Sequence, residues 1–392
     1  MPAEPTSISL RFGGLPAPRV ERTKAHPLID ILTIGLCAVL CGGEGWTDMA
    51  TFGQARAAWL RTFLALPNGI PSHDTTPTAV GTRRVFGAAF VAWVRAVAPQ
   101  TAEHRPAGTR AIDGKTLRRS HGRAKGKAAL HLVSAWADAS GLVLGQLAVD
   151  DKSNAITAIP ALLQLLDVRG CTGTIDAMGC QTAIARRIVA QGGNDVLAPK
   201  NNHPTLHDDV QAIFAEARAT AFAGLAPQHH SAAKTVGKDH GRLEIRRPWT
   251  RTDPAILAYL DEAGRWAGLG GIGLVEAERR IGDQRSVEVR HYLLGAPLDA
   301  ATFGHVIRCH WGIENKRHWV LDVTCNEDAS RIRAGQATQN LAALRHLALN
   351  LLRQDTTRTG SGATKRFRAA LAPDYRTALL ADPHAPSASP TP

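Results

Sequence analysis

Three acidic residues occupy positions where a protein could hold divalent cations. Asp113 directly follows residues 109–112, Asp176 directly follows residues 172–175, and both stretches are predicted to be short strands. Ligands of open α/β sheets bind at the carboxyl ends of the strands, so both carboxylates are expected at one binding edge. They would repel each other unless a cation lay between them. Magnesium prefers oxygen ligands and retains several waters, so two or three carboxylates suffice to hold it.

Each aspartate could also have a purely local role. Asp-Gly is a turn dipeptide, and Asp113 with Gly114 fits the case in which the carboxylate merely caps the turn after its strand. For either aspartate alone this capping role is the better interpretation. The presence of both acids on two strands of one predicted sheet favours the metal site.

Glu314 is the third candidate because of its place in a predicted helix. Residues 305–323 have helical periodicity, and one stripe along them contains Ile307, Trp311, Glu314, His318 and Leu321. A glutamate in an apolar stripe costs free energy unless it is paired or bound to a metal. Two alternatives to metal binding stay open: the stripe is partly exposed at Glu314, or a nearby arginine pairs with it.

The charge of the chain favours a polyanionic partner. Its 392 residues include 46 Lys and Arg against 34 Asp and Glu, a formal net charge of +12. Residues 110–127 hold seven basic residues and one acid, and residues 301–380 hold twelve basic residues and six acids, so each window carries +6. Solvated basic faces would account for both windows. Because the windows also contain Asp113 and Glu314, a nucleic-acid groove is the sharper hypothesis.

The sequence predicts neither a membrane span nor secretion. The most apolar run, residues 29–40, is too short to cross a bilayer, and no secretory signal starts the chain. The six cysteines include no Cys-x-x-Cys pair, which argues against a structural zinc site. We therefore expect a cytoplasmic protein with free thiols.

The elements that must position the acids fall into regions of different periodicity. Residues 1–25 are predicted to be a flexible arm, and residues 26–98 a small all-helical domain. From residue 108 to 355 the pattern predicts an α/β domain with a β-rich insertion at about 221–300. Residues 356–392 are expected to form a basic and then disordered tail.

Within the α/β region the predicted elements alternate. A hairpin is expected from strands 130–137 and 142–149, because residues 138–141 read Asp-Ala-Ser-Gly. The insertion is expected to hold strands 243–249, 272–280 and 287–294, and a long helix should follow from about 301 to 318. The remaining predicted elements are helices 155–166, 182–191 and 206–219 and strands 172–175 and 195–198.

Several long segments carry a family resemblance. AIDGKTLRRS (111–120), LHLVSAWADASGLVLGQLAVDDKSNAITAIPALLQLLD (130–167), TIDAMGCQTAIARRIV (174–189) and HWGIENKRHWVLDVTCNEDASRIR (310–333) resemble the H-repeat-associated transposases of bacterial insertion sequences. Residues 31–53 and 66–75 are similar to that family's associated helical domain. The resemblance covers nearly the whole chain.

The resemblance implies a fold, an activity and a set of partners. It implies a ribonuclease H-like α/β core with an Asp-Asp-Glu triad, which falls on Asp113, Asp176 and Glu314. The expected reaction is cleavage and transfer of DNA strands with two Mg²⁺ ions, for which Mn²⁺ is an expected substitute. The partners would be double-stranded DNA, as element ends and target, and further copies of the chain. Phosphates near the cut would be held by Lys115, Arg118 and Arg119.

The chain also departs from the pattern of this family. Residues 76–83 are inserted where the family runs on almost directly, and residues 199–204 differ from the usual motif. Related transposases place an arginine four residues before the glutamate and a lysine seven residues after it, where this chain has His310 and Leu321.

Two rival functions share the same acids. One is a plain metal-dependent nuclease, which would cut without joining. The other is a non-catalytic or decayed transposase-derived DNA-binding protein. The retention of all three acids argues against the second rival.

Overall fold

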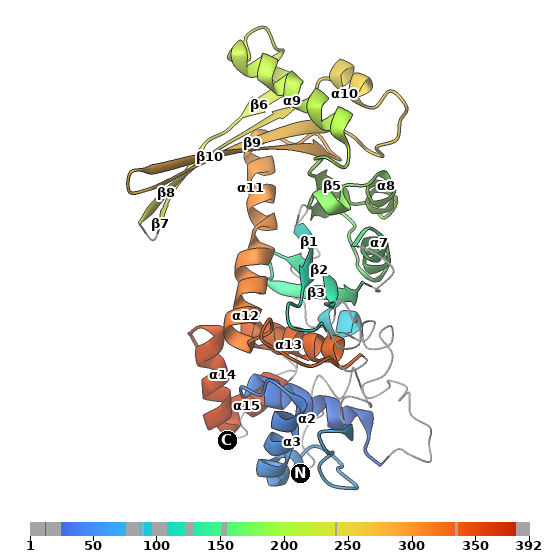
Figure 1. Ribbon diagram of the computed structural model, residues 1–392, viewed down its shortest axis with the longest axis vertical. Helices are drawn as coiled ribbons and strands as arrows, with labels where there is room; N and C mark the ends of the chain where they lie inside the picture. Colours follow the sequence, from blue (N-terminus) through green and yellow to red (C-terminus); the bar gives the residue numbers. More distant parts are fainter. Residues whose placement is uncertain are drawn as a thin grey trace, which may run out of the picture.

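The structure is a computed structural model, and it describes residues 12, 25–75, 87, 90–95, 108–121, 129–149, 155–239, 241–333 and 336–381. Nearly all of the predicted arm, the inserted residues 76–83 and the end of the predicted tail lie outside these residues. The molecule is elongated, with helices at one end, a sheet in the middle and a β-ribbon that projects at the other end (Figure 1).

The middle of the molecule is a mixed sheet, as the predicted α/β class requires. Its first five strands lie in the order β3-β2-β1-β4-β5, where β1, β4 and β5 are parallel and β2 and β3 run antiparallel. The predicted hairpin joins β2 to β3, and its Gly141 has a φ of +66°. These strands are β1 (Thr109–Thr116), β2 (His131–Ala137), β3 (Leu142–Ala148), β4 (Thr172–Ile175) and β5 (Asn194–Leu197).

Helices cover both faces of these five strands. On β1, Ile112 packs into a core with α7 (Ala155–Leu165) and α8 (Thr182–Ala190), whereas its neighbour Ala111 belongs to the core on the other face. Successive side chains of a strand point to opposite faces. Asp113, two residues after Ala111, is therefore directed to the face opposite α7 and α8.

The β-rich stretch extends the sheet instead of forming a separate body. β10 pairs antiparallel with β5 through Leu293 opposite Leu197, which continues the sheet to ten strands. The added strands pair antiparallel with one another. The elements of this part are α9 (Pro204–Ala219), η5 (Pro227–His229), β6 (His230–Ala232), β7 (Thr235–Asp239), β8 (Arg242–Arg251), α10 (Pro254–Leu260), β9 (Gly271–Ile281) and β10 (Gln284–Leu294).

A helical segment then returns across the sheet. α11 (Ala300–His310) packs on β8, β1 and β4, so the chain comes back to the first strands after the insertion. The long helix predicted over about 301–318 is present as α11 and a π-helical turn, η6 (Ile313–His318), which leads into α12 (Trp319–Cys325); the π-helical turn was not predicted. A π-helical turn adds a residue per turn and rotates the side chains that follow it.

The helical end is built from both ends of the described chain. The helix α2 (Leu28–Leu40) packs on α13 (Ala337–Gln354), and both contribute to one apolar core. Residues after 356, predicted to be a tail, continue in this core as α14 (Gly362–Leu371) and α15 (Pro373–Leu380). The N-terminal helices therefore share their core with the C-terminal ones. The remaining elements here are α3 (Trp46–Ala55) and α4 (Ala57–Leu60).

Several basic residues of the window 301–380 are buried in the helical part of the molecule. Arg366 donates to the carbonyl oxygens of Val39 and Thr324, and Lys365 donates to those of Leu352 and Asp355. Cations near the last carbonyls of helices are favourable because those carbonyls carry partial negative charge. Five of the twelve basic residues in this window are buried, which the prediction of a DNA-facing basic surface did not anticipate: Arg317, Arg345, Lys365, Arg366 and Arg376.

Two further sequence predictions concern membrane spans and thiols. No helix of the described residues is long and apolar enough to cross a bilayer. All six cysteines are free thiols.

The packing of α11 on the sheet depends on Gly273 of β9. A Cβ atom added at Gly273 would lie 2.5 Å from the Phe303 ring of α11. We expect Gly273→Ala to lower the free energy of unfolding by about 1–3 kcal/mol, as overpacking of a core does. Urea denaturation measures this. Gly237→Ala in β7, where nothing lies within 4 Å, is the control and should match the wild type. Equal stability of both variants would contradict the packing.

Candidate active site

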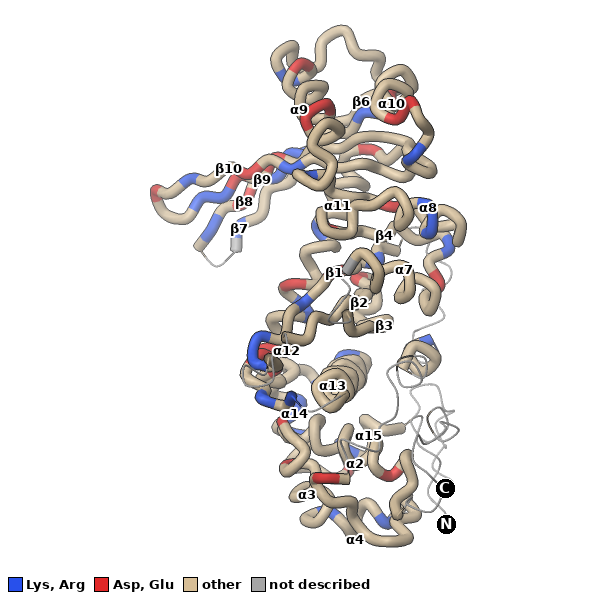
Figure 2. The backbone as a smooth tube through the Cα atoms, turned by 45° about the vertical axis from the view of Figure 1, so that its right-hand side comes forward, with Lys and Arg blue, Asp and Glu red and all other residues tan. Residues whose placement is uncertain are grey.

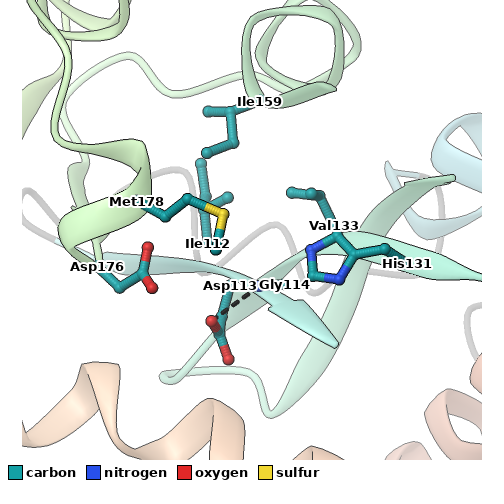
Figure 3. A pocket seen from close by; sticks show the side chains of 8 residues that line it. All are labelled: Ile112, Asp113, Gly114, His131, Val133, Ile159, Asp176 and Met178. Atoms are coloured by element: carbon teal, nitrogen blue, oxygen red, sulfur yellow. Dashed lines mark hydrogen bonds between the residues drawn. The ribbon is translucent and has the colours of Figure 1, made fainter. Parts of the chain in front are cut away.

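Asp113 and Asp176 line one small pocket at the open edge of β1 and β4. Figure 3 shows both carboxylates on the same side of this pocket. Its volume is about 20 Å³, which is room for about one water-sized group. The other lining residues are Ile112, Gly114, His131, Val133, Ile159 and Met178.

Parallel strand pairing brings the two aspartates together. In the β1–β4 register Ile112 lies opposite Ile175, so the next residue along each strand is an aspartate. The predicted strand at 172–175 ends at Ile175 as expected, whereas β1 continues through Asp113 to Thr116. Asp113 is therefore held by strand pairing with Ser134 of β2, not by a turn.

The environment of Asp113 disfavours its negative charge. Burial raises its pKa to about 6, and repulsion from Asp176 and Glu314 acts in the same direction. Two groups oppose the rise: the Gly114 N–H, which donates to Oδ1 at 2.8 Å, and the positive charge of Arg317. Asp113 is thus a largely buried carboxyl group beside two further acids.

Asp176 is both a helix cap and a pocket residue. It is the N-cap residue of a short 3₁₀ helix, η4 (Ala177–Gly179), whose Gly179 N–H lies 3.4 Å from Oδ1. The same side chain lines the pocket with Asp113. Capping accounts for its orientation but does not exclude metal binding, because a carboxylate has several acceptor positions.

Glu314 lies on the π-helical turn η6 and is exposed. Ile307 and Leu321 of the predicted stripe are buried, so the stripe opens at Glu314, which was one of the two alternatives to metal binding. Glu314 does not line the small pocket, although its charge acts on Asp113. Among the described residues, no three His, Cys, Asp or Glu side chains form a group able to hold a metal ion.

The π-helical turn also supplies two basic residues behind Asp113. His318 Nδ1 lies 3.6 Å from Asp113 Oδ2. Arg317 is buried, and its guanidinium donates to Ser134 Oγ at 2.5 Å and to His346 Nε2 at 3.1 Å. Burial lowers the pKa of His318 to about 2, and the charges of Arg317 and Lys115 act in the same direction, so His318 is neutral. The helical periodicity used for Glu314 did not identify Arg317, because the added residue of a π turn changes which side chains face the sheet.

His310 occupies the position where related transposases carry an arginine. Its Nδ1 lies 2.9 Å from Thr174 Oγ1 on β4, two residues before Asp176. Burial lowers its pKa to about 4, against the attraction of Asp176, so this ring is neutral at pH 7. The position therefore does not supply the permanent cation that an arginine would.

The three predicted phosphate-binding residues lie in different environments. Lys115 is about 10% exposed, and its Nζ lies 2.5 Å from Asp322 Oδ1, 3.0 Å from Glu327 Oε2 and 3.7 Å from Asp328 Oδ1. Arg118 is 84% exposed with one ion pair, to Asp328 at 3.3 Å. Arg119 is also exposed. The two arginines are accessible to a ligand, whereas Lys115 ties β1 to the segment after η6.

Comparison with known families identifies the chain. Residues 104–351, more than half of it, match the family model described as "Transposase DDE domain", and residues 10–94 match the model described as "DDE_Tnp_1-associated". The chain belongs to the DDE-domain transposase family. The transposase domain thus includes all three candidate acids and the β-rich stretch.

Curated relatives extend over nearly the whole transposase. "H repeat-associated putative transposase YhhI" of Escherichia coli (strain K12) is 37% identical over 91% of this chain and 93% of the relative. "Putative transposase YncI" of Escherichia coli O157:H7 is 36% identical over 94% of this chain and 92% of the relative. The expected resemblance to H-repeat-associated transposases is confirmed.

The raised pKa of Asp113 predicts a pH-dependent stability of the metal-free protein. A carboxyl group whose pKa rises from 3.8 unfolded to about 6 folded contributes stability at pH 4 that is lost as the pH rises through 6. Above pH 6 the loss is on the order of 3 kcal/mol. Asp113→Asn should remove this part of the pH dependence, so the metal-free variant should be more stable than the wild type at pH 7.5.

Urea denaturation in EDTA at pH 4.5 and 7.5 checks this expectation. Glu216→Gln, at an exposed position of α9, is the matched control and should follow the wild type. An Asp113→Asn protein that loses stability at pH 7.5 would show that the carboxylate is stabilised without metal.

Proposed function

We propose that this transposase cuts DNA strands and joins their 3′ ends to new sites, with Asp113, Asp176 and Glu314 as its metal-binding triad. The observation that carries the proposal is the pairing of β1 with β4, which brings two acids 63 positions apart in the chain into one pocket. Glu314 reaches the same region because α11 returns across β1 and β4. We also propose that the five strands β3-β2-β1-β4-β5, with their flanking helices, are a ribonuclease H-like core.

The acids present suit divalent cations. All three are carboxylates, the ligands that Mg²⁺ and Mn²⁺ prefer. Asp113 is crowded by two like charges, and a cation would relieve that repulsion. Asp113 would hold both of two ions, with Asp176 and Glu314 holding one each. When bound, such ions activate the attacking water or 3′-hydroxyl and stabilise the leaving oxygen.

The chain's own residues would orient the acids. The Gly114 N–H holds one oxygen of Asp113, and His318 lies beside the other. Behind them Arg317 provides a buried permanent cation, anchored on Ser134 and His346, which lowers the pKa of Asp113 and favours its ionised form. We propose these contacts as the support that keeps Asp113 directed at the pocket.

Phosphate contacts are proposed for the exposed basic residues after β1. Arg118 and Arg119 are accessible, and such contacts would position DNA without reading its sequence. Lys115 would have to leave three carboxylates to reach a phosphate. We therefore propose that Lys115 stabilises the connection between β1 and the segment after Glu314.

Glu314→Gln tests the triad because it keeps the shape of the side chain and removes its charge. Mg²⁺-dependent nicking of DNA that carries the element's ends should fall by at least ~100-fold, as expected when a metal ligand worth several kcal/mol is lost. Because Glu314 is exposed, the melting temperature in EDTA should stay near that of the wild type. Normal nicking by the folded variant would remove Glu314 from the site.

Two controls make this assay specific. Glu216→Gln, an exposed glutamate of α9, should cleave like the wild type. A strand-transfer assay on the same samples separates a transposase from a nuclease. Wild-type protein that nicks but never joins would contradict the proposed joining step, and wild-type protein that does neither would support a non-catalytic DNA-binding role.

The double variant Arg118→Gln, Arg119→Gln tests the phosphate contacts. We expect the slope of log K against log salt for duplex DNA to become shallower by up to about 0.9 for each lost contact. Fluorescence anisotropy at several salt concentrations gives the slope. A double variant of two exposed arginines elsewhere, Arg61→Gln with Arg186→Gln, controls for net charge. Equal slopes for the two double variants would mean that Arg118 and Arg119 face away from DNA.

A further inference from the structure

A large groove lies between the projecting β-ribbon and α11. The ribbon consists of β7, β8, β9 and β10, and α11 runs from beneath it down to β1 (Figure 1). The volume of the groove is about 1030 Å³. No residue of the proposed triad lines it, so it is distinct from the pocket of Asp113 and Asp176.

One face of the ribbon forms one wall of this groove. The strand registers place Arg246 beside Ala277 and Ala277 beside Glu288, and they place Arg279 beside Ser286. All of these residues line the groove, as alternation along the strands requires. Figure 2 shows Lys and Arg interspersed with Asp and Glu along the same three strands.

The exposed side of α11 forms the other wall. Ala301, Gly304 and Arg308 line the groove at helical spacing, while Phe303 and Val306 are buried against the sheet. A Cβ atom at Gly304 would lie 2.8 Å from Pro248 Cγ of β8, so the glycine allows the helix to lie close to the strand. This close packing of α11 on β8 fixes the bottom of the groove, where its two walls meet.

The groove carries excess positive charge. Seven Lys or Arg and four Asp or Glu line it, a difference of +3. Some of these charges neutralise each other, such as Arg246 with Glu244 and Arg290 with Glu288. Arg279 and Arg308 are exposed, and neither forms a salt bridge with another described residue. In the β8–β9 register Arg279 lies opposite Glu244, which itself pairs with Arg246. An excess of cations in a concave site favours a polyanion.

The size and position of the groove narrow the choice of polyanion. Its volume is at the upper end of the ~300–1,000 Å³ of small-molecule pockets, enough for a few nucleotides of one strand but not for a duplex. One end is lined by Gly312, Asn315 and Lys316, which flank Glu314 in the sequence. There Arg290 covers one face of the partly buried Trp311 ring at 4.1 Å, and a guanidinium plane held over an aromatic ring is itself a surface on which a base can stack.

We propose that this groove binds a short single-stranded segment of DNA that leads away from the cleavage site. Arg279 and Arg308 contact its phosphates from the two walls, and the guanidinium of Arg290, held on Trp311, lies against its bases at the end next to Glu314. The link between groove and cleavage rests on the proposed function, whereas single-strand binding by the groove does not.

The experiment measures binding without metal, so it is independent of cleavage. A fluorescein-labelled dT oligonucleotide and a duplex of equal length are titrated with full-length protein in EDTA at several salt concentrations. The variant is Arg279→Gln, Arg308→Gln. Its matched control is Lys238→Gln, Arg265→Gln, because both residues are exposed and neither lines the groove. Lys238 pairs with Leu243, which places it on the opposite face of the same ribbon. Thermal unfolding confirms that each protein is folded.

The expected result is a selective loss of single-strand binding. The groove variant should have a weaker affinity for dT, with a salt slope shallower by up to about 1.4 for two lost contacts, and the control should follow the wild type. Equal loss in groove variant and control, unchanged dT binding by the groove variant, or an equal loss of duplex binding would each overturn the proposal. If the expected binding is found but wild-type protein never cleaves DNA, the proposed function fails and the groove assignment stands.

Discussion

The cost of a negative charge on buried Asp113 is the constraint around which the rest of the site is arranged. Burial is the larger part of this cost, and the parallel pairing of β1 with β4 adds to it by placing the like charge of Asp176 at the same edge. A fold that only needed stability would gain by replacing either acid. Instead, the Gly114 N–H and the charge of Arg317 offset part of the cost of the negative charge on Asp113. The carboxylate keeps an open side where a cation would offset the rest.

Buried cations change how the net charge of the chain is understood. Arg366 and Lys365 satisfy carbonyls at helix ends, and Lys115 holds three carboxylates together. These residues contribute to the formal charge of +12 but are not available to DNA. Exposed basic residues include Arg118 and Arg119 after β1 and Arg279 and Arg308 in the groove beneath the ribbon. A total charge therefore indicates the class of partner, and the structure is needed to locate the contact.

Local patterns predicted much of the sheet and less of the site. The strand 172–175 and the hairpin at 138–141 were predicted correctly because turn residues and alternation are local signals. Glu314 was placed on an apolar stripe, with its exposure left open, and in the structure it is exposed on a π-helical turn at Ile313–His318, of which a periodicity of 3.6 contains no sign. The shared core of α2 and α13 joins residues some 300 positions apart, and no local pattern encodes that contact. Arg317 was missed because it lies on the π-helical turn and because its partners, Ser134 and His346, are distant from it in the sequence.

The central claim is that Asp113, Asp176 and Glu314 together hold divalent cations, and diffraction from crystals of the full chain grown with Mn²⁺ tests it most directly. Anomalous scattering locates manganese independently of any assumption about activity. We predict manganese within about 2.0–2.3 Å of carboxylate oxygens from all three residues. Manganese bound by Asp113 and Asp176 while Glu314 stays turned to solvent, or bound elsewhere, would contradict the claim.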